Sequence, residues 1–135
     1  MRSTTEHTVK AFDEELGELR GLVAQMGGLA EHAISGAMEA LRRHDLTTAQ
    51  QVVTGDKRID ALETEIERLT IRLIALRAPM ADDLREVVAA LKIATVLERV
   101  GDYAKSIAKR VSLIDDHTQI EPLSVLPAMA TLATD

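Results

Sequence analysis

The sequence predicts an all-α fold, an antiparallel up-down-up bundle of three long helices followed by the start of a fourth helix. Apolar residues recur in steps of three and four along most of the chain, which is the spacing of one helical face. The three prolines all lie late, at Pro79, Pro122 and Pro127. Phe12 and Tyr103 are the only aromatic residues, so the core must be aliphatic, which suits packing of helix on helix.

The first helix is predicted over residues 5–43. Gly27 and Gly28 lower the helix propensity inside it by about 1 kcal/mol each relative to alanine, but the apolar spacing continues on both sides. We therefore expect one continuous helix, with small residues that allow close packing at this point. Its predicted buried face consists of Val9, Phe12, Leu16, Leu19, Val23, Met26, Ala30, Ala33, Ala37 and Leu41.

The second helix is predicted to begin near residue 45, where Asp45, Thr47 and Thr48 are each able to cap it. It runs to about Arg77 and ends there, because the residue before Pro79 is pushed away from helical angles. Its predicted buried face consists of Ala49, Val52, Asp56, Ile59, Leu62, Ile66, Leu69, Leu73 and Leu76.

The third helix is predicted to carry Pro79 in its first turn, where a missing N–H costs nothing, and to continue to about Ile114. Asp82 and Asp83 follow in the first turn, where the helix dipole favours acidic side chains. The predicted inward face of this helix consists of Leu84, Val88, Leu91, Thr95, Glu98 and Asp102.

The chain of 135 residues is short enough for a single domain. We expect residues 1–116 to form the bundle and residues 117–135 to supply a linker and a truncated helix. Within that tail, 115–122 is predicted as a polar loop and 123–134 as a helix with Pro127 near its start.

The composition excludes several classes of function. A net charge of −6 opposes binding to the phosphate backbone of nucleic acids. The absence of cysteine rules out disulfides and thiolate metal sites. The first residues lack the apolar run of a signal peptide, and no stretch reaches the roughly 18 apolar residues needed to span a bilayer. We therefore expect a cytoplasmic protein that does not bind nucleic acid.

Two pairs of acidic residues interrupt the apolar faces, Asp56 with Asp60 and Glu98 with Asp102. The members of each pair are four residues apart, which places them on one side of a helix. Asp60 and Glu98 are equally distant from Pro79 in sequence, and so are Asp56 and Asp102. Because antiparallel helices rise equally per residue, the hairpin brings the two pairs to the same level. The sequence therefore predicts four carboxylates on two facing helices.

Four negative charges at that spacing need protons, basic neighbours or cations. Oxygen ligands favour hard or borderline ions, so the candidates are divalent or trivalent iron, zinc, manganese or magnesium. Gly101, inside the second pair, gives room for an ion or for close approach of the helices. The alternative is that the acids lie off the helix seam and are solvated, with Arg58, Arg99 or Lys105 as their partners.

Other residues give weaker signals. His32 is either an additional ligand or an ordinary surface histidine. Arg85, Lys92 and Arg99 recur every seven residues and either meet an acidic partner or phosphate, or form a solvated edge. No Glu-x-x-His pair, glycine-rich phosphate loop or nucleophile elbow is present. Carboxylates with a metal could hydrolyse phosphate esters, but no general base stands beside them, so we do not expect an enzyme.

The chain resembles the PhoU family, the regulators of bacterial phosphate uptake, over nearly its whole length. The segment Leu97-Glu98-Arg99-Val100-Gly101-Asp102 is the most specific part. The other segments that carry the resemblance are Met26-Gly27-Gly28-Leu29, Gly55-Asp56-Lys57-Arg58-Ile59-Asp60, Pro79-Met80-Ala81-Asp82-Asp83-Leu84-Arg85 and Ala90-Leu91-Lys92-Ile93.

The resemblance implies two tandem three-helix bundles, each with paired (Asp/Glu)-x-x-x-Asp motifs that hold a metal cluster. Carried onto this chain, the ligands are Asp56, Asp60, Glu98 and Asp102. This sequence departs from the pattern, because within its 135 residues we expect one bundle and only the truncated start of a second repeat, within residues 117–135. That departure puts the second metal site, full regulation and the usual oligomer in doubt.

The resemblance also implies a function. Family members repress the phosphate-starvation response and link the phosphate ABC transporter and its ATPase to a sensor histidine kinase. They are cytoplasmic, peripheral to the inner membrane through their partners, and often homodimers. We therefore predict a metal-binding helical adaptor that acts by binding alone. The alternatives are a histidine phosphotransfer carrier, with His32 as the phosphorylated residue, and a metal-dependent phosphohydrolase.

Overall fold

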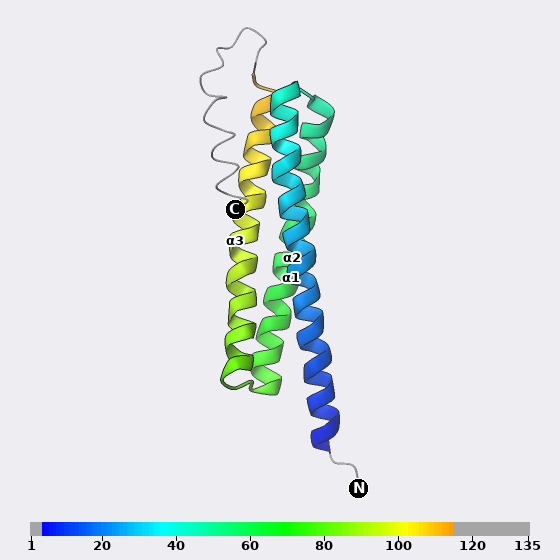
Figure 1. Ribbon diagram of the computed structural model, residues 1–135, viewed down its shortest axis with the longest axis vertical. Coiled ribbons are helices and arrows are strands. Elements are labelled where there is room, and N and C mark those ends of the chain that lie inside the picture. Colours follow the sequence, from blue (N-terminus) through cyan, green and yellow to red (C-terminus); the bar gives the residue numbers. More distant parts are fainter. Residues whose placement is uncertain (1–3, 115–135) are drawn as a thin grey trace.

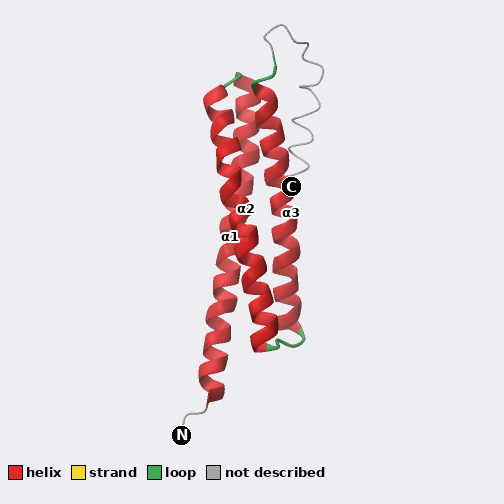
Figure 2. Cartoon of the chain, turned by 180° about the vertical axis from the view of Figure 1, so that it is seen from behind, coloured by secondary structure: helices red, strands yellow, loops and turns green. Residues whose placement is uncertain are grey.

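The computed structural model describes residues 4–114, which form three long helices lying side by side (Figure 1). These are α1 (Thr4–Arg43), α2 (Leu46–Arg77) and α3 (Asp82–Val111). The described residues contain no strand (Figure 2). The chain reverses between α1 and α2 at one end of the molecule and between α2 and α3 at the other. The predicted all-α, up-down-up bundle is therefore confirmed.

The junction between α1 and α2 follows the sequence closely. His44 adopts a positive φ of 54°, which ends α1. Of the three predicted caps, Asp45 serves α2, because its Oδ1 accepts a hydrogen bond from the backbone N–H of Thr48 at 3.1 Å. The hydroxyl of Thr48 also donates to Oδ2 of Asp45 at 2.7 Å. This cap supplies a partner for one of the N–H groups that every helix start leaves free.

The junction between α2 and α3 differs from the prediction. α2 ends at Arg77 as expected, but Pro79 is not part of α3, which begins only at Asp82. The four residues between the helices reverse the chain through positive φ angles at Ala78 (44°) and Ala81 (51°). Because the reversal requires non-helical residues on both sides of the proline, Pro79 lies in the connection.

α1 runs without interruption through its two central glycines, as predicted. The expected close packing at this point is absent. A Cβ on Gly27 would lie an ordinary 3.9 Å from Cδ1 of Leu97, and a Cβ on Gly28 would meet nothing within 4 Å. Neither glycine is therefore required by the packing of the bundle.

The buried face of α3 also differs from the prediction. Leu84 is 38% exposed, Thr95 and Asp102 are exposed, and Val88 is only half-buried. The predicted face is therefore the edge of α3 that borders α2. The true core face is rich in alanine. α3 packs against both α1 and α2, and small side chains allow both helices to approach it. This core face consists of Val87, Ala90, Ala94, Val100, Gly101, Ala104, Ile107, Ala108 and Val111.

The faces predicted for α1 and α2 are largely buried, with exceptions at their ends. Val9 of α1 and Leu76 of α2 are exposed. Thr70 of α2, which was not predicted to be buried, is buried. The predicted tail, with its loop over 115–122, its helix over 123–134 and its division at residue 117, lies outside the described residues. No helix among residues 4–114 has the length and hydropathy that a bilayer span requires.

Candidate metal centre

Carboxylates from α2 and α3 meet in the half of the α2–α3 hairpin that lies away from its turn. Asp56 replaces a core residue on α2 and is 3% exposed, whereas Asp60, one turn later, is exposed. α3 contributes Asp102. One carboxylate oxygen from each of these three residues lies within 4.8 Å of the other two. The predicted register of the hairpin about its turn is therefore confirmed at this level.

Glu98 stands beside this group on α3. A hydrogen bond with Asp102, partial burial and the negative charges of Asp102, Glu63 and Asp60 raise the pKa of Glu98 to about 7. A glutamate normally ionises near pH 4.3. Near neutral pH, Glu98 is therefore partly protonated, because crowded carboxylates favour the neutral form of one of their members.

The environment of Asp56 combines burial with an incomplete set of partners. Burial, followed by the charges of Asp60 and Asp102, raises the pKa of Asp56, and the ammonium of Lys105 opposes that rise. Nζ of Lys105 lies 3.6 Å from Oδ2 of Asp56. Oδ1 of Asp56 is buried and accepts no hydrogen bond. A buried carboxylate oxygen without a partner is costly, so this atom is available to a cation.

The alternative interpretation, in which basic side chains neutralise the acids, is therefore correct for Lys105 and Asp56. Arg58 and Arg99, the other two candidates for that role, are exposed. Asp56 is not solvated off the seam, because it lies on the core face of α2. Asp60 and Asp102 are exposed, as expected if these two acids are solvated.

Gly101 shapes the wall of the site. A Cβ added to it would lie 3.1 Å from Oδ1 of Asp56 and 3.2 and 3.3 Å from two carbon atoms of Ile59. Contacts this short require the neighbours to move, and Ile59 is itself buried. The absence of a side chain at Gly101 therefore keeps a methyl group away from the buried oxygen of Asp56 and lets α3 approach α2, as the sequence suggested.

A fifth carboxylate, that of Glu63, lies near the site and was not predicted from the sequence. Burial and then the charges of Asp60, Glu67 and Asp102 raise the pKa of Glu63. The signal was available, because Asp56, Asp60 and Glu63 follow one another at intervals of four and three residues, which is the spacing of one helical face.

The remaining candidates lie elsewhere. His32 is exposed on α1, and the group of described residues that could hold a metal does not include it. It lines a cavity of about 110 Å³ between α1 and α2. The other residues that line this cavity are Leu29, Ala33, Gly36, Thr48, Gln51, Val52, Gly55 and Ile59.

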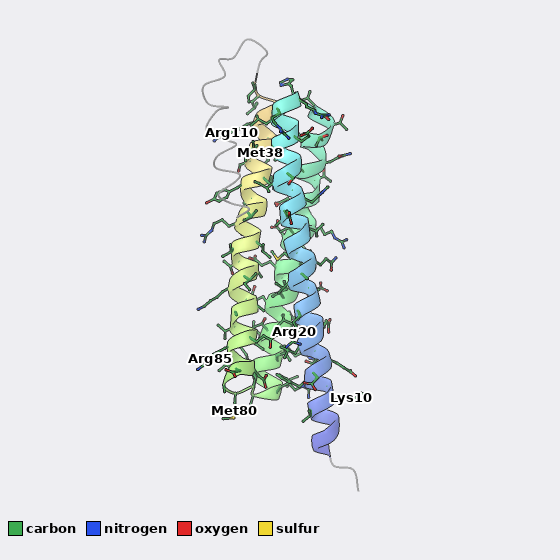
Figure 3. All side chains as sticks on the ribbon, viewed as in Figure 1. Lys10, Arg20, Met38, Met80, Arg85 and Arg110 are labelled. Carbon is green, nitrogen blue, oxygen red and sulfur yellow. The ribbon has the colours of Figure 1, made fainter. Side chains whose placement is uncertain are left out.

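The basic stripe on α3 behaves as a solvated edge, which was the simpler of its two interpretations. Arg85, Lys92 and Arg99 are all exposed. Arg85 Nη1 donates to Oδ1 of Asp82 at 3.0 Å, within the first turn of α3. Figure 3 shows Arg85 near the connection between α2 and α3, where Met80 marks the end of the hairpin.

The residues present fit a hard metal ion. The donors are all carboxylate oxygens, which suit magnesium, manganese, iron or zinc in sites of this kind. The buried oxygen of Asp56 lacks a partner, and Gly101 places no side chain against it. Chemically, such an arrangement can hold a cation between two helices and neutralise their repulsion.

Comparisons with known proteins show which family the chain is similar to. The PhoU domain matches residues 23–111, which include both acidic pairs. The chain is 54% identical over 129 residues to the phosphate-specific transport system accessory protein PhoU homolog of Zymomonas mobilis, covering 96% of this chain and 54% of that protein.

Solved structures show the same fold. Over 91% of this chain and 59% of the other, the bundle matches crystalline PhoU from Pseudomonas aeruginosa with a TM-score of 0.83 and 31% identity. Over 92% and 60%, it matches the phosphate transport system regulatory protein PhoU from Streptococcus pneumoniae with a TM-score of 0.78 and 30% identity. The chain spans about half the length of the curated relatives it matches. On the extent of the domain match and the identity to its relatives, the chain belongs to the PhoU family.

Proposed function

We propose that this chain is a metal-binding helical adaptor in phosphate transport, which represses the phosphate-starvation response and modulates phosphate uptake. Membership of the PhoU family supports the link to transport, because relatives are described as accessory or regulatory proteins of phosphate transport systems. The observation that carries the metal-binding part is the buried, unpartnered oxygen of Asp56 beside the carboxylates of Asp60 and Asp102.

Asp56, Asp60, Glu98 and Asp102 would hold the metal. When bound, the ion supplies positive charge that offsets their repulsion. Asp56 anchors the site because it is fixed in the core, while Asp60 and Asp102 close it from the surface. Glu98, whose pKa is raised to about 7, would lose its proton in order to join them. The ion thereby couples α2 to α3 and changes the charge of the surface they share.

The adaptor would work by binding two partners, a sensor histidine kinase and the ATPase of the phosphate ABC transporter. Phosphate status would bias which of the two complexes forms, and no covalent step is needed. In this proposal the protein acts in the cytoplasm as a homodimer and reaches the inner membrane through its partners. His32, the residue that a phosphotransfer carrier would use, is exposed on α1 and is not part of the group of described residues suited to metal.

The metal site is tested by replacing Glu98 and Asp102 together with alanine. After loading with iron, zinc, manganese or magnesium and removal of free ions, elemental analysis should show a large loss of bound metal, with helix content by circular dichroism nearly unchanged. Glu14→Ala with Glu18→Ala is the matched control, because both side chains are exposed on α1 and the charge change is equal. Equal metal content in the two double variants would remove these ligands from the proposal.

The partner contacts are tested by titrating the cytoplasmic part of the sensor kinase and, separately, the transporter ATPase with the metal-loaded protein. We expect each to bind, and the variant lacking Glu98 and Asp102 to alter the ratio of the two affinities. Binding to neither partner, under conditions where the bundle is folded, would contradict the adaptor role.

A further inference from the structure

Lys105 lies directly beside the proposed metal centre and carries the opposite charge to its ligands. It follows Gly101 by four residues and Asp102 by three, so its side chain shares their side of α3. Its Nζ stands 3.6 Å from Oδ2 of Asp56. One carboxylate that the metal would use is therefore already paired with a cation of the chain itself.

The two cations compete for the same charge. A metal ion shared by Asp56, Asp60 and Asp102 would stand close to the ammonium of Lys105, and like charges at such distances repel strongly where burial lowers the effective dielectric. Asp56 is fixed, with only 3% of its side chain exposed, whereas 35% of the Lys105 side chain is exposed. The flexible lysine stem can therefore swing its ammonium into water, and the carboxylate cannot move away.

We propose that Lys105 is a resident counter-ion that competes with the metal for Asp56. In the metal-free protein the ammonium neutralises the buried carboxylate and keeps the bundle intact. When a metal binds, the ammonium leaves for solvent, where it becomes an exposed positive charge beside the site. This inference rests on the proposed metal site and adds how loading is regulated: the lysine lowers metal affinity and couples occupancy to the charge of the α3 surface.

The first test compares metal affinities by calorimetric titration with Mn²⁺ at fixed pH and salt. Lys105→Met keeps the length of the apolar stem and removes the charge, so it should bind Mn²⁺ about tenfold more tightly, which corresponds to about 1.4 kcal/mol. Lys105→Arg retains the charge and should stay close to the wild type. Lys92→Met is the charge-matched control, because Lys92 is exposed on the same helix; it should leave the affinity unchanged.

The second test measures thermal unfolding of the same proteins without metal. Lys105→Met should lower the midpoint, because it leaves Asp56 buried without its counter-ion, and saturating Mn²⁺ should abolish the difference from wild type. Lys92→Met should leave the midpoint of thermal unfolding unchanged, both without metal and with saturating Mn²⁺. A counter-ion with no link to metal would leave the difference in place after Mn²⁺ is added.

A third measurement needs no substitution and therefore does not depend on a variant that folds. Acetylation of lysines by an amine-reactive reagent, followed by mass spectrometry, should be several-fold faster at Lys105 with Mn²⁺ than without it, and unchanged at Lys92. Equal Mn²⁺ affinity in wild type and Lys105→Met, or equal labelling of Lys105 in both states, would overturn the competition alone. Failure of every protein to bind Mn²⁺ would overturn the metal site and the competition together.

Discussion

Gly101 sets the distance between α3 and the buried carboxylate of Asp56. A Cβ at this position would press against the buried Oδ1 of Asp56 and against two carbon atoms of Ile59, which would have to move to make room for it. At the scale of single residues, a hydrogen atom in place of a methyl group thus determines both the packing of the hairpin and access to the candidate metal ligand.

Gly101→Ala should therefore lower the free energy of unfolding by about 1–3 kcal/mol, as overpacking in a core does, and weaken metal binding as well. Gly28→Ala is the control: a Cβ there meets nothing, so the higher helix propensity of alanine should stabilise the protein by about 1 kcal/mol. Urea unfolding of both variants measures the effect. Stabilisation of both would show that α2 and α3 do not need the glycine.

Asp56 also shows how a charged residue is kept in a hydrophobic face. Its neighbours along the core face of α2, Val52 and Ile59, are both buried, so the carboxylate cannot reach bulk water. Lys105 satisfies one of its oxygens and leaves the other without a partner. Pairing with Lys105 lets the bundle fold without metal, and the unpartnered oxygen of Asp56 remains able to bind a cation.

At the scale of elements, the connection between α2 and α3 places two alanines, Ala78 and Ala81, at positive φ angles that alanine does not favour. Ala81 adopts φ 51° and ψ −119°, and its side chain makes no capping hydrogen bond to α3. Alanine in this region of backbone space is strained by about 1–2 kcal/mol. The hairpin nevertheless closes at this position, and its turn sets the register that brings Asp102 beside Asp56 and Asp60.

Ala81→Gly should therefore raise the free energy of unfolding by about 1 kcal/mol, since glycine populates positive φ angles without a steric penalty. Chemical denaturation gives the measurement. Ala75→Gly serves as the control on the exposed side of α2, where glycine inside a helix should destabilise by about 1 kcal/mol. If glycine at position 81 destabilised the protein as well, the strain in this connection would be refuted.

At the scale of the whole molecule, the acidic cluster makes stability depend on pH. Asp56, Glu63 and Glu98 all have raised pKa values, that of Glu98 reaching about 7. Between the usual carboxylate range and pH 7, the folded protein therefore binds more protons than the unfolded chain. The stability contributed by these groups is present at low pH and is lost as the pH rises through their raised pKa values, which for Glu98 is about 7.

The metal-free protein should therefore be less stable at pH 8 than at pH 5.5, by about 1–2 kcal/mol after allowing for solvent screening of Glu98. Urea unfolding at the two pH values measures this difference, and Glu98→Gln should reduce it. Added Mn²⁺ should stabilise the protein more at pH 8, because metal binding requires deprotonated ligands. A stability that rose with pH over this window in the absence of metal would contradict the crowding of the carboxylates.

The sequence by itself determined the three helices, a capped start of α2 near residue 45, the end of α2 at Arg77 and the level at which the two acidic pairs meet. These features depend on local spacing and on equal rise per residue in the two arms of a hairpin, which are readable from the chain. The PhoU resemblance was likewise carried by contiguous segments and was confirmed by the domain match.

Only the tertiary structure decided which side of α3 is buried, which of the acids lies in the core, and which cation stands beside it. The buried side of α3 is set by two neighbouring helices at once, and its alanines carry too little hydrophobicity to reveal it in a pattern of large apolar residues. The pairing of Lys105 with Asp56 joins residues from different helices, and such a contact is fixed by how closely those helices pack at Gly101.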